Sequence, residues 1–199
     1  MPTSLRLVPA IVVLLTGAAT AAEPCAVVPE LGLTAVAEDR LARLEEARSR
    51  GIAEALEDGA AEADEVVEAL FEQGLTPVAE MPAGPYQCRT IKFGGPFGSF
   101  VAYSWFRCRI EAAESGYTIE KLTGSQRFTG DLIEVGGGLV FRGADHYADE
   151  SPLAYGDDPE RNAVGCVSRV APGAGSYLLE QPLPFLESTH DVIELKPTG

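Results

Sequence analysis

The hydrophobic period of this chain changes once, inside a short connector at residues 75–85 that contains three prolines. Before the connector, over residues 35–74, apolar side chains recur every three or four positions, which is typical of amphipathic helices. After it, over residues 86–199, apolar and polar side chains alternate, which is typical of strands with one buried face. A helical part followed by a strand-rich part predicts an α+β fold with antiparallel strands.

The helical part is expected to form a hairpin, because Gly59 and Gly74 each stand where a helix C-terminus favours a left-handed residue. Eight strands are expected in the second part, separated by turns rich in glycine and proline. They are residues 86–93, 100–110, 117–123, 127–135, 139–144, 163–170, 176–181 and 189–196. Strands at this spacing predict a meander that is strongly bent or closed into a small β-barrel. The helical hairpin is expected to pack on the meander or to plug it.

The first 22 residues have the order of features of a secretory signal peptide. Arg6 precedes an apolar run at residues 7–15, and small residues follow, including Ala19-Thr20-Ala21. We therefore predict that residues 1–22 are removed, that residues 23–199 form a single domain, and that this domain is periplasmic or secreted. The apolar run is too short to span a bilayer, so no membrane insertion is expected after cleavage.

The chain is strongly acidic, with 30 acidic and 15 basic residues and a formal net charge of −15. Such a charge repels nucleic-acid phosphates and anionic membrane surfaces, which argues against nucleic acid as a partner. Residues 86–130 depart from this pattern, because they hold six basic and three acidic side chains. This segment is where the charge of the chain would favour an anion, and the expected partner is a small anionic ligand or an envelope protein.

The chain contains four cysteines, Cys25, Cys88, Cys108 and Cys166. An even number of cysteines in an exported chain favours disulfide bonds. Three pairings exist, and the best joins Cys88 to Cys108 across a predicted hairpin, which leaves Cys25 with Cys166. The spacing lacks Cys-x-x-Cys and the chain has two histidines, so neither a metal site nor a cofactor is expected.

Three arginines form the first candidate anion site. Aligning Cys88 with Cys108 across the hairpin sets Arg89 opposite Arg107, with Arg109 beside them. Two facing guanidinium groups are unfavourable unless an anion or a carboxylate lies between them. One interpretation is that acidic side chains pair with these arginines at the surface. The other is that the three arginines bind a carboxylate or a phosphate.

Lys121, Ser125 and Arg127 form a second polar cluster around Gly124. The simplest interpretation is a tight turn between two strands. The alternative is that the turn adds backbone N–H groups and the Ser125 hydroxyl to the anion site. The pattern of a phosphate-binding loop is absent, and no helix is expected to follow.

Each of the two histidines stands beside an acid, as Asp145-His146 and His190-Asp191. A hydrolase or isomerase that uses His146 or His190 is therefore the enzymatic hypothesis. Adjacent strand residues point to opposite faces, so the sequence predicts no relay geometry for either pair. We favour a non-enzymatic domain that binds a small ligand or a partner. A structural protein of the cell envelope is the third hypothesis.

Several separate stretches carry a resemblance to one known family. They are residues 86–94 (YQCRTIKFG), 106–110 (FRCRI), 121–127 (KLTGSQR) and 140–143 (VFRG), with Asp39-Arg40-Leu41 before them and residues 184–188 and 191–195 after them. With these stretches the chain resembles a family of secreted bacterial proteins catalogued as domain of unknown function 4893. The resemblance covers most of the chain after the signal peptide. It implies no reaction, cofactor or partner.

Overall fold

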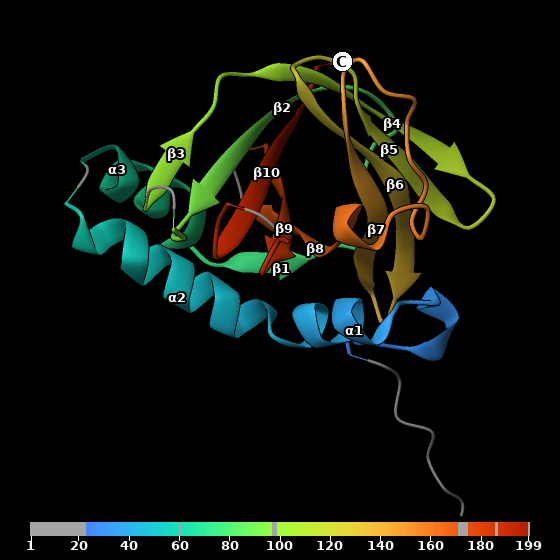
Figure 1. Cartoon of the computed structure of the whole chain (residues 1–199), viewed down its shortest axis with the longest axis horizontal. Coiled ribbons are helices and arrows are strands. Elements are labelled where there is room, and N and C mark those ends of the chain that lie inside the picture. Colours follow the sequence, from blue (N-terminus) through green and yellow to red (C-terminus); the bar gives the residue numbers. More distant parts are fainter. Residues whose placement is uncertain (1–22, 60, 97–98, 171–174, 186, 199) are drawn as a thin grey trace, which may run out of the picture.

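The computed structural model of the chain describes residues 23–59, 61–96, 99–170, 175–185 and 187–198 (Figure 1). The predicted signal peptide, residues 1–22, lies outside them. Among the described residues three α-helices come first, α1 (Ala35–Ala42), α2 (Leu44–Glu57) and α3 (Ala61–Phe71), after a short 3-10 turn, η1 (Pro29–Leu31). The strands are β1 (Leu75–Pro77), β2 (Gly84–Phe93), β3 (Phe100–Ala102), β4 (Phe106–Ala113), β5 (Gly116–Lys121), β6 (Gln126–Val135), β7 (Gly138–Tyr147), β8 (Asn162–Val170), β9 (Tyr177–Pro182) and β10 (His190–Pro197), with a second 3-10 turn, η2 (Pro159–Arg161), before β8.

Eight of the strands close into an antiparallel barrel. Their order is β8-β7-β6-β5-β4-β2-β10-β9, and β9 pairs with β8 to complete the ring. The two short strands lie outside this ring, since β1 pairs with β8 and β3 pairs with β2. The predicted α+β fold with a small closed barrel is therefore confirmed. The strand predicted at residues 100–110 is in fact two strands, β3 and β4, separated by residues 103–105.

Alternate residues of the barrel strands point inward and form the main hydrophobic core. All eight strands contribute, among others Tyr86, Cys108, Ile119, Phe128, Phe141, Val167, Leu179 and Leu195. The Phe141 ring occupies space that side chains at two paired glycines would fill. A Cβ atom added at Gly130 or at Gly143 would lie 2.5 Å from this ring. Glycine is required at both positions because the ring approaches their backbone so closely.

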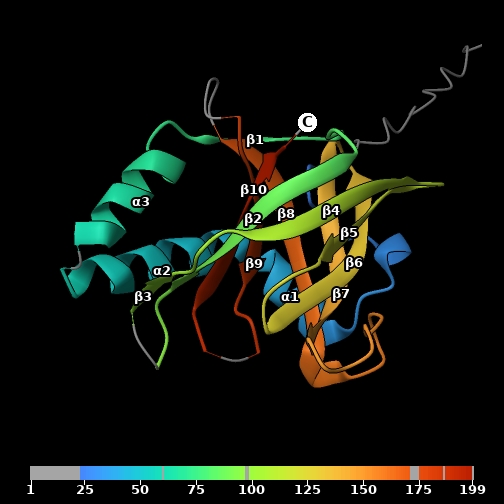
Figure 2. The same ribbon diagram turned by 90° about the horizontal axis from the view of Figure 1, so that it is seen from above.

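The three helices pack on the outside of the barrel and do not plug it (Figures 1 and 2). α2 and α3 cover outward residues of β2 and β10, such as Ile91 and Val192. The segment leading into α1 covers the outer faces of β7 and β8. Gly51 allows the close approach of α2, because a Cβ atom there would lie 2.9 Å from the His190 Cβ atom. The predicted helical hairpin is therefore a set of three helices, with a break between α1 and α2 at Arg43.

Both predicted cysteine pairings are confirmed. Cys88 and Cys108 join β2 to β4 inside the barrel, and Cys25 and Cys166 join the N-terminal segment to β8 outside it. The Cα atoms are 5.8 Å apart in each pair, within the usual range for a disulfide. Two disulfides indicate an oxidising environment outside the cytoplasm. Among the described residues, no helix has the length and apolar character needed to cross a bilayer.

Candidate functional site

A cavity of about 110 Å³ opens at one end of the barrel. The loops that follow β5, β7 and β9 meet at this end, along the lower edge of Figure 2. The inner wall carries six polar residues, Thr90, Lys92, Lys121, Asp145, Gln181 and Asp191. Since a single water needs roughly 10–15 Å³ by this measure, the cavity has room for several waters or a small molecule.

The polar wall arises from a change in the inward-facing residues along the strands. In β2 the inward series runs from Cys88 to Thr90 and Lys92 as it nears the cavity. In β9 the apolar inward residues end before the polar residue Gln181. In β10 they begin after the polar residue Asp191. The same barrel interior therefore has an apolar core at one end and a polar cavity at the other.

Lys92 forms ion pairs with two carboxylates. Its Nζ atom lies 3.1 Å from an Asp191 oxygen and 3.3 Å from a Glu187 oxygen, and the Ser188 hydroxyl donates to Asp191 at 2.5 Å. Burial lowers the pKa of Lys92, but the two carboxylates raise it by more, so the net shift is upward. Lys92 and Asp191 are therefore a charge-matched pair.

Lys121 has no such partner. Its side chain is only 6% exposed, and its Nζ atom lies 4.5 Å above the Phe106 ring. Among the described residues, nothing accepts a hydrogen bond from it or forms an ion pair with it. Burial lowers the pKa of Lys121; the charge of Asp145 opposes this shift and that of Lys92 adds to it. The cavity wall thus contains one largely buried cation that forms no ion pair with a described residue.

Asp145 is an acidic residue of the same inner wall. The Asp145 side chain is exposed to solvent through the cavity, although protein atoms surround it closely. This burial, and then the charge of Asp191, raise the pKa of Asp145 to about 6, against the opposing charges of Lys92, Arg40 and Lys121. No other described side chain forms an ion pair or hydrogen bond with it. Asp145 therefore changes its charge close to neutral pH.

Two further nitrogen atoms near the cavity have no hydrogen-bond partner within the described part of the chain. They are Nε2 of Gln181 and Nε2 of His146, and both residues are more than nine-tenths buried. The other ring nitrogen of His146 lies 3.0 Å from the backbone oxygen of Tyr147. Buried polar atoms are normally paired, so the Gln181 amide is a donor that a bound molecule can satisfy.

The mouth of the cavity carries two exposed aromatic rings. Tyr147 is 44% exposed and Phe185 is 54% exposed, and both line the opening together with Pro184. The Arg161 guanidinium lies 4.7 Å above the Tyr147 ring and pairs with Glu150. The opening therefore presents apolar surface at its rim and polar groups deeper inside, as small-molecule sites usually do.

The family model described as Domain of unknown function (DUF4893) matches residues 32–195. The chain belongs to the DUF4893 family. Its matched region contains all three helices, seven barrel strands and most of β10, and every residue of the polar wall. No curated protein and no solved structure matches the chain.

The DUF4893 fold separates the residues predicted for one anion site. Lys121 and Arg127 line the cavity, and Ser125 lies in the exposed loop between β5 and β6 at the same end. The Arg127 Nε atom donates to the backbone oxygen of Gly124 in this loop, as expected of a tight turn. The predicted cluster of Lys121, Ser125 and Arg127 is thus brought to one end of the barrel.

The three predicted arginines lie elsewhere, on the outer face of the DUF4893 barrel. Arg89 pairs with Glu194 at 2.7 Å and stacks on the Trp105 ring. Arg107 lies opposite Gln87, so the predicted pairing of Arg89 with Arg107 is wrong. The reason is that Cys88 and Cys108 are diagonal neighbours, offset by two residues from the direct alignment assumed from the sequence.

Arg107 and Arg109 line an open groove on the outer face of β2 and β4. Arg109 lies 3.4 Å from Glu111, and both side chains are exposed. This contact fits the simpler interpretation of surface ion pairing. The groove is separate from the cavity, because no residue lines both of them.

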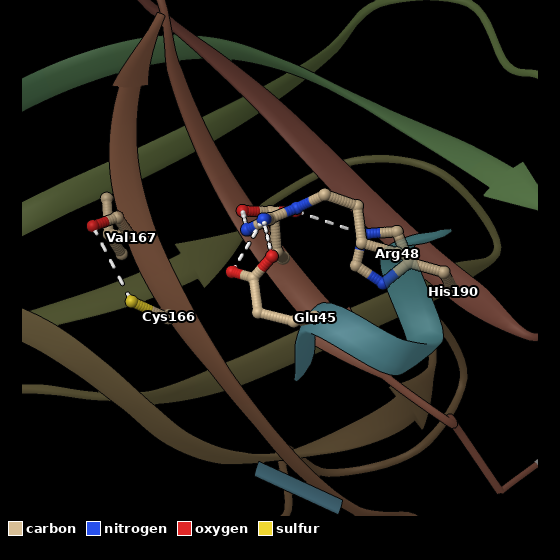
Figure 3. Close-up of polar contacts among 6 residues, drawn as sticks. Glu45, Arg48, Cys166, Val167 and His190 are labelled. Atoms are coloured by element: carbon tan, nitrogen blue, oxygen red, sulfur yellow. Dashed lines mark hydrogen bonds and ion pairs between the residues drawn. The ribbon is translucent and has the colours of Figure 1, made fainter. Parts of the chain in front are cut away.

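His190 also lies outside the cavity, in a polar cluster buried between α2 and the barrel (Figure 3). Its Nε2 atom is 3.1 Å from Glu180, which also accepts two hydrogen bonds from Arg48, at 2.6 and 2.7 Å. Burial raises the pKa of Glu180, but hydrogen bonds from His190 and Arg48 lower it by more, so the net shift is downward. The two histidines of the enzymatic hypothesis are therefore in different places, His146 at the cavity and His190 beneath α2.

Proposed function

We propose that this DUF4893 protein binds a small carboxylate in the cavity at the end of its barrel, as a non-enzymatic binding protein of the periplasm or the secreted space. The single observation that carries the proposal is Lys121, a residue only 6% exposed, whose ammonium forms no ion pair with a described residue beside the cavity. A buried charge without a partner is costly, and a bound anion would remove this cost.

A carboxylate suits the donors that the cavity offers. Lys121 provides a charged N–H donor and Gln181 provides a buried amide N–H group that lacks a partner. Hydrogen bonds to charged groups are stronger than those between neutral groups, so a carboxylate gains from both donors. The volume of about 110 Å³ suits a molecule with few atoms inside the cavity, and larger parts would extend to the aromatic rim.

A purely structural envelope protein gives no reason for this arrangement. Filling the polar end with apolar residues would extend the barrel core and remove the buried charge. In the cavity, Lys121, Asp145 and Gln181 can instead contact a bound molecule. This favours binding over a structural role.

Calorimetric titration with acetate, butanoate and 3-phenylpropanoate tests the proposal. We expect 3-phenylpropanoate to bind, and we expect Lys121→Gln to raise its Kd at least tenfold, because a hydrogen bond to a charged group contributes about 1.5–3 kcal/mol. The matched control is Arg107→Gln, which removes a cation from the outer groove and should leave the Kd unchanged. Failure of all three carboxylates to bind, or equal binding by Lys121→Gln, would overturn the proposal.

A further inference from the structure

We propose that the ligand is an amino acid with an apolar side chain, held by its carboxylate at Lys121 and by its ammonium at Asp145. Its side chain lies against the rings of Tyr147 and Phe185 at the mouth. This inference rests on the proposed function, because it names the class of molecule that occupies the same cavity. It follows from the charges of Lys121 and Asp145 on the inner wall and from the exposed aromatic rings at the rim.

The inner wall of the cavity holds two charged side chains of opposite sign that form no ion pair with a described residue. Lys92 and Asp191 neutralise each other at 3.1 Å, whereas Lys121 and Asp145 have no ion-pair partner among the described residues. A simple anion at Lys121 would lie in the same small cavity as the ionised Asp145, which repels it. A simple cation at Asp145 would meet the charges of Lys92 and Lys121. A zwitterion can pair with both Lys121 and Asp145, so it is the ligand that best matches these two charges.

The rim indicates that the ligand also carries an apolar group. Tyr147 and Phe185 are both exposed where they line the mouth, and Pro184 lines the same cavity. The loop that presents Phe185 is bounded by two non-glycine residues in the left-handed region, Leu183 with φ +45° and Glu187 with φ +80°. Such backbone strain is retained mainly where a function requires it. An aromatic or aliphatic side chain would cover these rings when the polar groups are bound inside.

The ionisation of Asp145 makes the proposal sensitive to pH. Inside the barrel, Asp145 faces Lys92, Lys121 and Asp191, with Arg40 of α1 behind the wall. At the mouth the charged or titratable groups are Arg127, His146, Glu160, Arg161 and Glu187. The pKa of Asp145 is raised to about 6, so its carboxylate is mostly protonated at about pH 5 and mostly ionised at about pH 7. An ammonium therefore binds better at the higher pH, whereas a simple carboxylate binds better at the lower one.

The experiment compares phenylalanine with 3-phenylpropanoate, which has the same ring and carboxylate but no ammonium. Calorimetry at about pH 5 and about pH 7 should show phenylalanine binding severalfold more tightly at pH 7 and 3-phenylpropanoate severalfold more weakly. Asp145→Asn should abolish both dependences, because it removes the carboxylate to which they are assigned. The wild-type comparison needs no variant, so it stands even if Asp145→Asn does not fold.

The outcomes separate this inference from the proposed function. If 3-phenylpropanoate binds and phenylalanine does not, the inference fails while the carboxylate site remains. If neither probe binds, both proposals fail. Alanine is the control for the rim: binding as tight as that of phenylalanine would overturn the role of Tyr147 and Phe185, and weaker binding supports it.

Discussion

Arg48→Met is expected to lower the free energy of unfolding by about 3–5 kcal/mol, the usual cost of leaving one member of a buried ion pair without its partner. Arg48 donates two hydrogen bonds to Glu180, whose side chain is 0% exposed between α2 and the barrel. Without Arg48, His190 alone would contact this carboxylate. The variant therefore keeps the buried charge of Glu180 but lacks the ion pair with Arg48 that stabilises it.

Urea unfolding followed by circular dichroism measures this effect, and two variants control it. Arg43→Met removes an arginine that pairs with Asp39 and Glu46 at the surface, so its effect should be far smaller. The double variant Arg48→Met/Glu180→Met removes both charges and should recover much of the lost stability. A loss in Arg48→Met no greater than that in Arg43→Met would contradict the role given to the buried pair.

The same cluster predicts how stability depends on pH. The pKa of Glu180 is lower in the folded protein than in the unfolded chain, because hydrogen bonds favour its charged form. Its contribution to stability is therefore complete above the unfolded pKa of about 4.3 and is lost as the pH falls through the lower, folded value. Unfolding curves below about pH 4.3 should show this loss in the wild type and a smaller loss in Glu180→Gln. Equal slopes in the two proteins would argue against it.

Removing the Cys25–Cys166 disulfide is expected to cost about 2–5 kcal/mol, the usual loss for a disulfide of a small exported domain. The bond joins residues separated by 141 positions, so it restricts much of the unfolded chain. In the folded state it ties the N-terminal segment to β8, next to the cluster of Leu31, Leu41 and Val164. We therefore expect loss of stability together with easier opening of the segment before α1.

Cys25→Ala/Cys166→Ala tests this prediction by urea unfolding and by limited proteolysis. The expected result is a lower unfolding midpoint and new cleavage before Ala35, with the rest of the chain protected. The wild type treated with reductant should move in the same direction, because both disulfides then open. An unchanged midpoint and an unchanged cleavage pattern would show that this bond does not hold the segment in place.

Much of the fold was predictable because it follows from local patterns. Alternation of apolar side chains placed the barrel strands, and Gly136-Gly137-Gly138 correctly indicated the turn between β6 and β7. The alternation pattern gave wrong strands where the strand boundaries do not follow from the local sequence. Residues 103–105 continue the alternation of a strand, yet they separate β3 from β4. β1 escaped prediction because it is short and lies in the connector with its prolines.

The site was less predictable, because its residues meet only when the barrel closes. Arg89 is neutralised by Glu194 of β10, a partner 105 residues away that no local pattern indicates. Lys121 was recognised as a candidate, whereas Thr90, Gln181 and the free carboxylate of Asp145 were not. One signal was available: the inward residues of β2, β9 and β10 turn polar toward the same end. Interpreting it requires the order of strands in the closed ring, which the sequence does not specify.

Whether the polar end of the barrel interior is a binding site is tested most directly by amide chemical shifts of isotope-labelled protein titrated with phenylalanine. The largest changes should occur at Thr90, Lys121, Asp145 and Gln181, which line the cavity. Changes centred on Arg107 and its neighbours in the outer groove, with the cavity amides unmoved, would contradict the assignment.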